Sequence, residues 1–149
     1  MNKSNFIKVI GIGAFLFLSI LELTILIEET LIQLQIILTA NASIEVQWFP
    51  EFIGLLIFSV LTFWTLRYTE KLVQMQRKRL HIISILDFFG ILLLQFIQPL
   101  VTTQYILRNY LDAFSHFYEN RNTYSNQMII GILDIVKYAV FALAVYLKK

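Results

Sequence analysis

Cysteine is absent from the 149-residue chain, and proline, glycine and charged residues are scarce. Without a thiol, the chain cannot form disulfides, thiolate metal sites or thiol redox centres. Two prolines and five glycines leave no linker rich in these residues, so residues 1–149 are expected to form a single domain. Charged residues make up 15% of the chain, against about a quarter in an average soluble domain. So little charge is atypical of a soluble protein.

Long apolar runs are what the chain has in abundance. Hydrophobic residues form 58% of the sequence, and they gather in four runs: residues 9–27, 48–66, 82–101 and 128–147. Each run approaches the roughly 20 residues that cross a bilayer as a helix. A soluble domain of this length has no interior large enough to bury four such runs. The sequence therefore predicts an all-α integral membrane protein with four transmembrane helices in an antiparallel bundle.

Lysine and arginine are distributed unevenly among the segments outside these runs. Five lie in residues 67–81 and four lie at the two chain ends, whereas residues 39–47 have none and residues 102–127 have two. Short cytoplasmic loops carry the excess of Lys and Arg in membrane proteins. We therefore expect a multi-pass protein of the cell membrane, with both termini and the second loop in the cytoplasm.

The second loop contains a compact basic cluster of Arg77, Lys78 and Arg79. Near an anionic membrane surface, each such residue contributes about 1 kcal/mol of attraction to lipid. The simpler interpretation is that the cluster only fixes the orientation of the chain. With either interpretation, the lipid bilayer is the first partner that the sequence predicts.

The third loop shows the spacing of an amphipathic helix. Ile106, Tyr110, Phe114 and Phe117 fall on one side, and polar or charged residues fall mostly on the opposite side. A helix of this kind either lies in the membrane interface or prolongs a neighbouring span. We therefore expect a short amphipathic helix in the external loop between the third and fourth spans.

Polar side chains within the apolar runs are the strongest indication of where function lies. Such groups are expensive in lipid and usually face a bundle interior or a cavity. A rise of about 1.5 Å per residue places one set in the same layer of the outer half of the membrane. The set consists of Glu22, Gln95, Asp134 and Lys137. Asp87 lies apart from them, about 9 Å from the inner boundary by the same rise.

The four residues of this layer are expected to form a network. Asp134 and Lys137 are three residues apart and share a helix face. We expect Glu22 to reach Lys137 from the first span and Gln95 to donate a hydrogen bond, while Glu28 marks the outer end of that span. Two carboxylates against one ammonium leave an excess negative charge, which a proton or another cation would neutralise. The alternative is a structural clamp whose hydrogen bonds contribute roughly 0.6 kcal/mol each.

Motifs of enzymes and nucleotide-binding proteins are missing from the sequence. It has no glycine-rich phosphate loop, zinc motif or nucleophile elbow, and His81 and His116 fall on opposite sides of the predicted membrane. We therefore expect no enzymatic activity, no cofactor and no nucleic-acid partner. The interpretation that we favour is a small membrane protein acting by protein–protein interaction in the bilayer. It would be a regulator, immunity factor or accessory subunit that binds another membrane protein or a second copy of itself.

The alternative is a small oligomeric transporter or channel. It would couple protons or cations through the carboxylates of its first, third and fourth spans.

Overall fold

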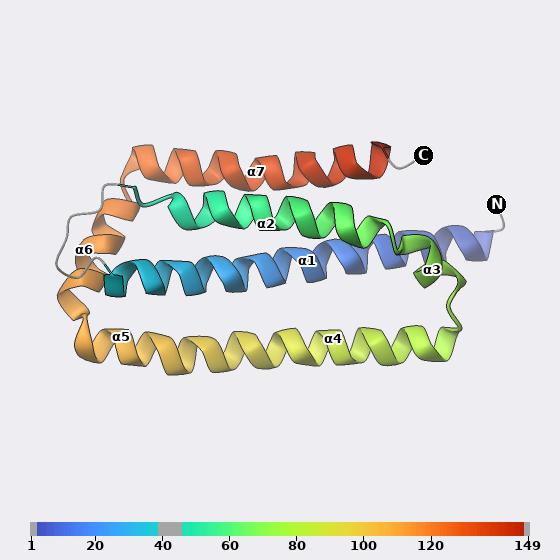
Figure 1. Cartoon of the computed structure of the whole chain (residues 1–149), viewed down its shortest axis with the longest axis horizontal. Coiled ribbons are helices and arrows are strands. Elements are labelled where there is room, and N and C mark those ends of the chain that lie inside the picture. The colour runs from blue at the N-terminus through green and yellow to red at the C-terminus, as the bar shows by residue number, and fades with distance from the viewer. Residues whose placement is uncertain (1–2, 39–45, 148–149) are drawn as a thin grey trace.

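The structure is a computed structural model that describes residues 3–38 and 46–147. Four long helices dominate this part of the chain (Figure 1): α1 (Lys3–Leu38), α2 (Phe49–Leu66), α4 (Arg77–Gln98) and α7 (Tyr124–Leu147). Each is long and apolar enough to cross a membrane. The shorter elements are α3 (Thr69–Gln74), a π-helical turn (Pro99–Thr103), α5 (Gln104–Asn109) and α6 (Leu111–Arg121). The prediction of an all-α membrane protein with four spans and a helical third loop is confirmed.

Two of the helical segments are longer than a bilayer requires. The 36 residues of α1 extend about 54 Å at 1.5 Å per residue, whereas the hydrocarbon core is roughly 30 Å thick. On the third span, α4 continues through the π-helical turn into α5 as one rod (Figure 1). The turn begins at Pro99, which has no N–H to donate and whose ring crowds the preceding turn. The helices of the first and third spans therefore extend beyond the hydrocarbon core that those spans would cross.

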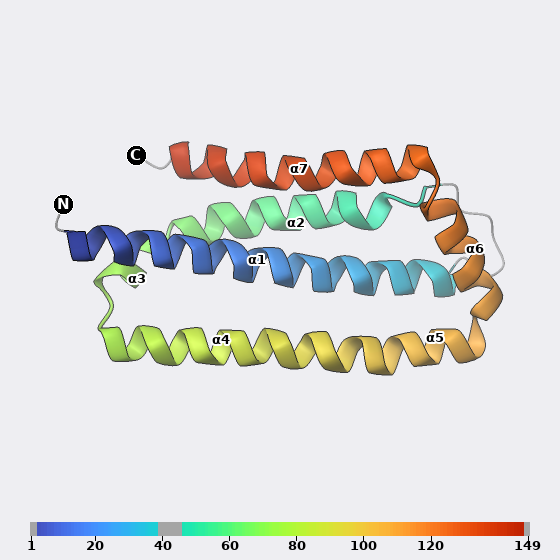
Figure 2. The same cartoon turned by 180° about the vertical axis from the view of Figure 1, so that it is seen from behind.

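The long helices are arranged unequally around α1. Figures 1 and 2 show α2 and α7 together on one side of α1 and α4 along the other side. Helices that follow one another run in opposite directions, so α1 and α4 are parallel. In α4, none of the apolar window that fits a membrane span is buried in the protein. The helix therefore packs mainly on α1 and leaves its other sides to the surroundings.

Aromatic rings join α1, α2 and α7. The Phe17 ring of α1 lies 6.2 Å from the Phe58 ring of α2 and 4.8 Å from the Phe141 ring of α7, both edge-on. Phe58 is fully buried. Edge-to-face rings at these distances gain about 0.5–1.5 kcal/mol beyond the area that they bury. This cluster holds α1, α2 and α7 together in the part of the molecule nearer the chain ends.

At the opposite end, α1 projects into a small cap formed with α5 and α6. Ile32 and Ile36 of α1 are buried against Ile106 of α5 and Phe117 of α6. The backbone breaks at Tyr110, where φ is −138° and ψ is 34°, and this break separates α5 from α6. The apolar stripe predicted in the third loop is therefore the packed side of two short helices rather than of one.

An ion pair fastens this cap to the start of α2. The Arg121 guanidinium contacts the Glu51 carboxylate and donates a second hydrogen bond to the Gln47 carbonyl at 2.9 Å. The side chains of Arg121 and Glu51 are 14% and 4% exposed, so little water screens the pair. The contact links the end of α6 to the first turn of α2.

Candidate functional site

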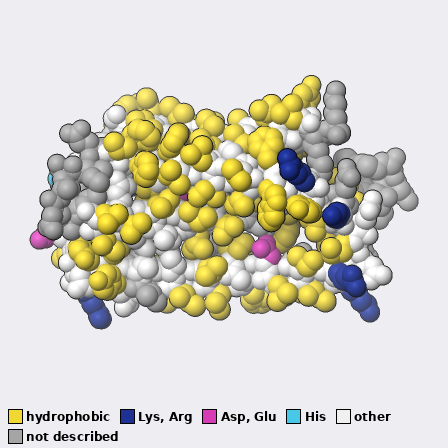
Figure 3. Space-filling model, viewed as in Figure 1, with side chains coloured by type: hydrophobic (Ala, Val, Ile, Leu, Met, Phe, Trp, Pro, Cys, Tyr) yellow, Lys and Arg dark blue, Asp and Glu magenta, His cyan; other side chains and the backbone are white. Residues whose placement is uncertain are grey.

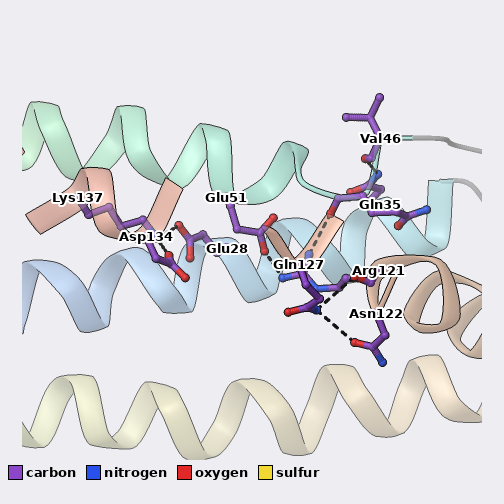
Figure 4. Close-up of polar contacts among 10 residues, drawn as sticks. Glu28, Gln35, Val46, Glu51, Arg121, Asn122, Gln127, Asp134 and Lys137 are labelled. Carbon is purple, nitrogen blue, oxygen red and sulfur yellow. Dashed lines mark hydrogen bonds and ion pairs between the residues drawn. The ribbon is translucent and has the colours of Figure 1, made fainter. Parts of the chain in front are cut away.

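Lys137 is a buried charge near the middle of α7. Only 2% of the residue is exposed. Its ammonium lies 2.6 Å from Glu28 Oε1 of α1 and 2.8 Å from Asp134 Oδ1, one turn earlier in α7 (Figure 4). A buried charge is tolerated only when it is paired and hydrogen-bonded. These two carboxylates satisfy that requirement and join α1 to α7.

Gly54 of α2 makes room for the Glu28 carboxylate. A Cβ atom built at Gly54 would overlap the carboxyl group of Glu28, so no residue with a side chain fits there without moving the glutamate. The glycine lies on the buried face of α2, one helical turn from Glu51. The charged cluster of Glu28, Asp134 and Lys137 therefore sits where α1, α2 and α7 meet.

The two acids of this charged cluster have different surroundings. Glu28 is 7% exposed and lies inside the helix group, whereas the Asp134 side chain is 52% exposed on the side of α7. With both acids ionised, the described side chains of the cluster carry one more negative than positive charge. Asp134 is the acid of the cluster that faces away from the helix group.

The structure confirms only part of the predicted network. Asp134 and Lys137 pair as expected, but Glu22 does not reach the lysine, and Glu28 takes that place. Glu22 and Glu28 are six residues apart, so they point about 120° apart around α1. The helix α1 continues past Glu28 to Leu38.

A second set of polar contacts forms a seam between α1 and α4. Gln95 donates a hydrogen bond to the Glu22 carboxylate, as the amide was expected to donate. Asp87 accepts a hydrogen bond of 2.6 Å from Ser19, so the interpretation of Asp87 as an isolated acid was wrong. Ser19, Glu22, Asp87 and Gln95 also line a cavity of about 280 Å³ whose other lining residues are apolar.

The predicted basic cluster begins α4. Lys78 and Arg79 are exposed, and the Arg77 side chain lies outside the described ones. Most of the Lys and Arg side chains visible in Figure 3 lie at the end of the molecule that holds α3 and the two chain ends. Between the two ends, the visible face is mainly hydrophobic, with Asp or Glu side-chain atoms interrupting it (Figure 3).

No group of three or more His, Cys, Asp or Glu side chains is placed to hold a metal ion within residues 3–38 and 46–147. The described polar residues pair charges and exchange hydrogen bonds in a low-dielectric setting. The chain matches no family model, and its comparison with curated proteins and with solved structures gives no match.

Proposed function

We propose that this four-span membrane protein acts by binding another membrane protein within the bilayer, in a non-enzymatic regulatory, immunity or accessory role. The half-exposed Asp134 carboxylate, midway along a membrane helix, is the observation that carries the proposal. An aspartate at the centre of a span costs about 2.5–3.5 kcal/mol on insertion scales. Lys137 offsets part of this cost, and a partner helix with a polar donor would cover the rest.

The packing of α4 supports the same proposal. Its apolar window is unburied within the protein, and its polar Gln95 is exposed although it bonds Glu22 across the seam. Helices in lipid associate through close packing and interhelical hydrogen bonds, because lipid tails give no hydrophobic drive between them. An exposed amide on α4 and an exposed carboxylate on α7 offer such contacts on two helices.

The proposed orientation places both chain ends in the cytoplasm. Arg67, Lys71, Lys78 and Arg79 are exposed at the end of the molecule that also holds the start of α1 and the end of α7. The excess of Lys and Arg in short loops marks the cytoplasmic side of membrane proteins. The cap of α5 and α6 then faces outward.

Photo-crosslinking in the native membrane tests the proposed interaction. A photoreactive phenylalanine replaces Tyr138, which is 55% exposed one turn from Asp134, or Val60, which is 68% exposed on α2. We expect one discrete adduct from position 138 that falls at least fivefold when Asp134→Asn is added, and no adduct from position 60. The size of the adduct distinguishes a second copy from another protein. Equal labelling at both positions, or an adduct indifferent to Asp134→Asn, would contradict the proposal.

The cavity between α1 and α4 supports the alternative of a proton- or cation-coupled transporter. Two carboxylates, Glu22 and Asp87, line it without a basic side chain among its lining residues. In proteoliposomes with an internal pH-sensitive dye, this alternative expects flux that Glu22→Gln and Asp87→Asn abolish. The exposed Asp112→Asn, on α6, serves as the matched control. If the internal pH of liposomes that contain the wild-type protein changes no faster than that of empty liposomes, the alternative is eliminated.

A further inference from the structure

A large apolar groove lies at the end of the molecule that holds the chain ends. Its volume is about 540 Å³, and its walls come mainly from three helices. Residues that line it include Val9, Gly13 and Leu16 of α1, Val73 of α3, and Phe141 and Val145 of α7. The volume falls within the range of ligand sites, roughly 300–1,000 Å³.

Gly13 leaves part of this groove open. A Cβ atom built at Gly13 meets no atom within 4 Å, so the space beside α1 is unfilled by the protein's own side chains. A larger residue at this position would project into the groove without displacing a neighbour. Gly11, two residues earlier, has equally open surroundings but is absent from the lining.

The mouth of the groove carries a fixed positive charge. The Lys8 ammonium donates hydrogen bonds to the Val73 carbonyl at 2.5 Å and to the Met75 carbonyl at 3.3 Å, at the C-terminal end of α3. Val73 of α3 lines the groove, and so does Val9 of α1, the residue after Lys8. An ammonium has three donors, so one remains for a ligand after these two bonds.

We propose that this groove binds an acyl chain of an anionic phospholipid, whose phosphate group is held by Lys8. The walls are nearly all hydrocarbon, as an acyl chain requires, and the charge at the mouth complements a phosphate. Exposed Arg67 directly follows the lining residue Leu66 at the end of α2. Basic pockets between membrane helices are sites for anionic headgroups. An anionic lipid therefore satisfies both the apolar walls and the charged mouth.

Native mass spectrometry of the purified full chain tests this site. Phosphatidylglycerol and phosphatidylcholine with identical acyl chains are titrated separately into the detergent-solubilised protein. We expect one high-occupancy adduct with phosphatidylglycerol and at least fivefold weaker binding of phosphatidylcholine. Gly13→Trp should abolish the phosphatidylglycerol adduct by filling the groove, whereas Gly11→Trp should leave it unchanged.

A second variant separates the charge at the mouth from the volume of the groove. Lys8→Gln removes the charge but keeps an amide that can donate to the Val73 or Met75 carbonyl, and it should reduce phosphatidylglycerol binding at least fivefold, to the level of phosphatidylcholine. Arg108→Gln, at an exposed position of α5 at the opposite end, is the charge-matched control and should have no effect. Equal affinity of the wild type for both lipids would overturn the proposal. So would equal lipid binding by Gly13→Trp and Gly11→Trp, or by Lys8→Gln and the wild type.

Discussion

Replacing Lys137 with methionine isolates the role of the buried charge. The substitution keeps much of the side-chain length but removes the ammonium that lies 2.6 Å from Glu28 and 2.8 Å from Asp134. Asp134 is half exposed, so a polar neighbour can reach it from outside. Glu28 is 7% exposed and faces Gly54, so it loses its counter-charge with no route to another.

The expected loss of unfolding free energy follows from the least costly response of Glu28 to the missing ammonium, which is to take up a proton. Protonating a glutamate with the ordinary pKa of about 4.3 costs about 3.7 kcal/mol at pH 7. This value falls within the roughly 3–5 kcal/mol measured when one partner of a buried ion pair is removed. The cost drops to about 1 kcal/mol at pH 5, because the carboxyl group is then close to protonation in the unfolded chain as well. We therefore expect Lys137→Met to lose about 3–4 kcal/mol of unfolding free energy at pH 7 and to regain most of it at pH 5.

Unfolding in mixed micelles of mild detergent and dodecyl sulfate, followed by the fluorescence of Trp48 and Trp64, measures this loss. The matched control is the double variant Glu28→Gln with Lys137→Met, which removes both charges and should recover most of the stability. A single variant within 0.5 kcal/mol of the wild type at pH 7 would refute the reasoning. A double variant as unstable as the single one would refute it too.

Two further predictions concern the contacts on either side of this charged cluster. Gly54→Ala should lose about 1–3 kcal/mol of unfolding free energy because its Cβ overlaps a carboxylate. Gly90→Ala, with open space around it, should be neutral or slightly stabilising in the same unfolding assay. Equal effects of the two substitutions would contradict the close approach of Gly54 to Glu28. Arg121→Gln leaves the buried Glu51 unpaired and should lose about 3 kcal/mol, with faster hydrogen exchange in α6. Exposed Arg108→Gln should change stability by less than about 0.5 kcal/mol, and exchange in α6 that is unchanged by Arg121→Gln would contradict the role of the ion pair.

The spans were predictable because they depend only on the length of each hydrophobic run along the sequence. The predicted run 48–66 differs by one residue from α2 (Phe49–Leu66), and the helices at 82–101 and 128–147 begin four or five residues earlier than predicted. Hydrophobic length against bilayer thickness is enough for such assignments. The outer boundary of the first span is harder to place, because two adjacent acids, Glu28 and Glu29, resemble its end although the helix continues to Leu38. The apolar residues that follow them were the signal that the helix continues.

The partners within the bundle were less predictable, because they depend on rotation about each helix axis. Counting residues gives the depth of Glu22, Glu28 and Lys137, but a helix that is apolar on all sides gives no preferred direction. The rotation of α1 about its own axis determines which glutamate meets Lys137. It turns Glu22 towards α4 and Glu28 towards α7. A glycine at the contact was a further signal, since Gly54 is the position where α2 can approach a carboxylate closely.

Cysteine accessibility tests the central claim, that these helices cross a bilayer and bury polar groups within it. The natural chain has no cysteine, so single cysteines can replace Lys78, Asn122 and the buried Thr24 without further changes. With a membrane-impermeant maleimide on intact cells, we expect labelling at position 122, labelling at position 78 only after permeabilisation, and none at position 24 in either case. Labelling of positions 78 and 122 from the same side, or ready labelling of position 24, would contradict the account.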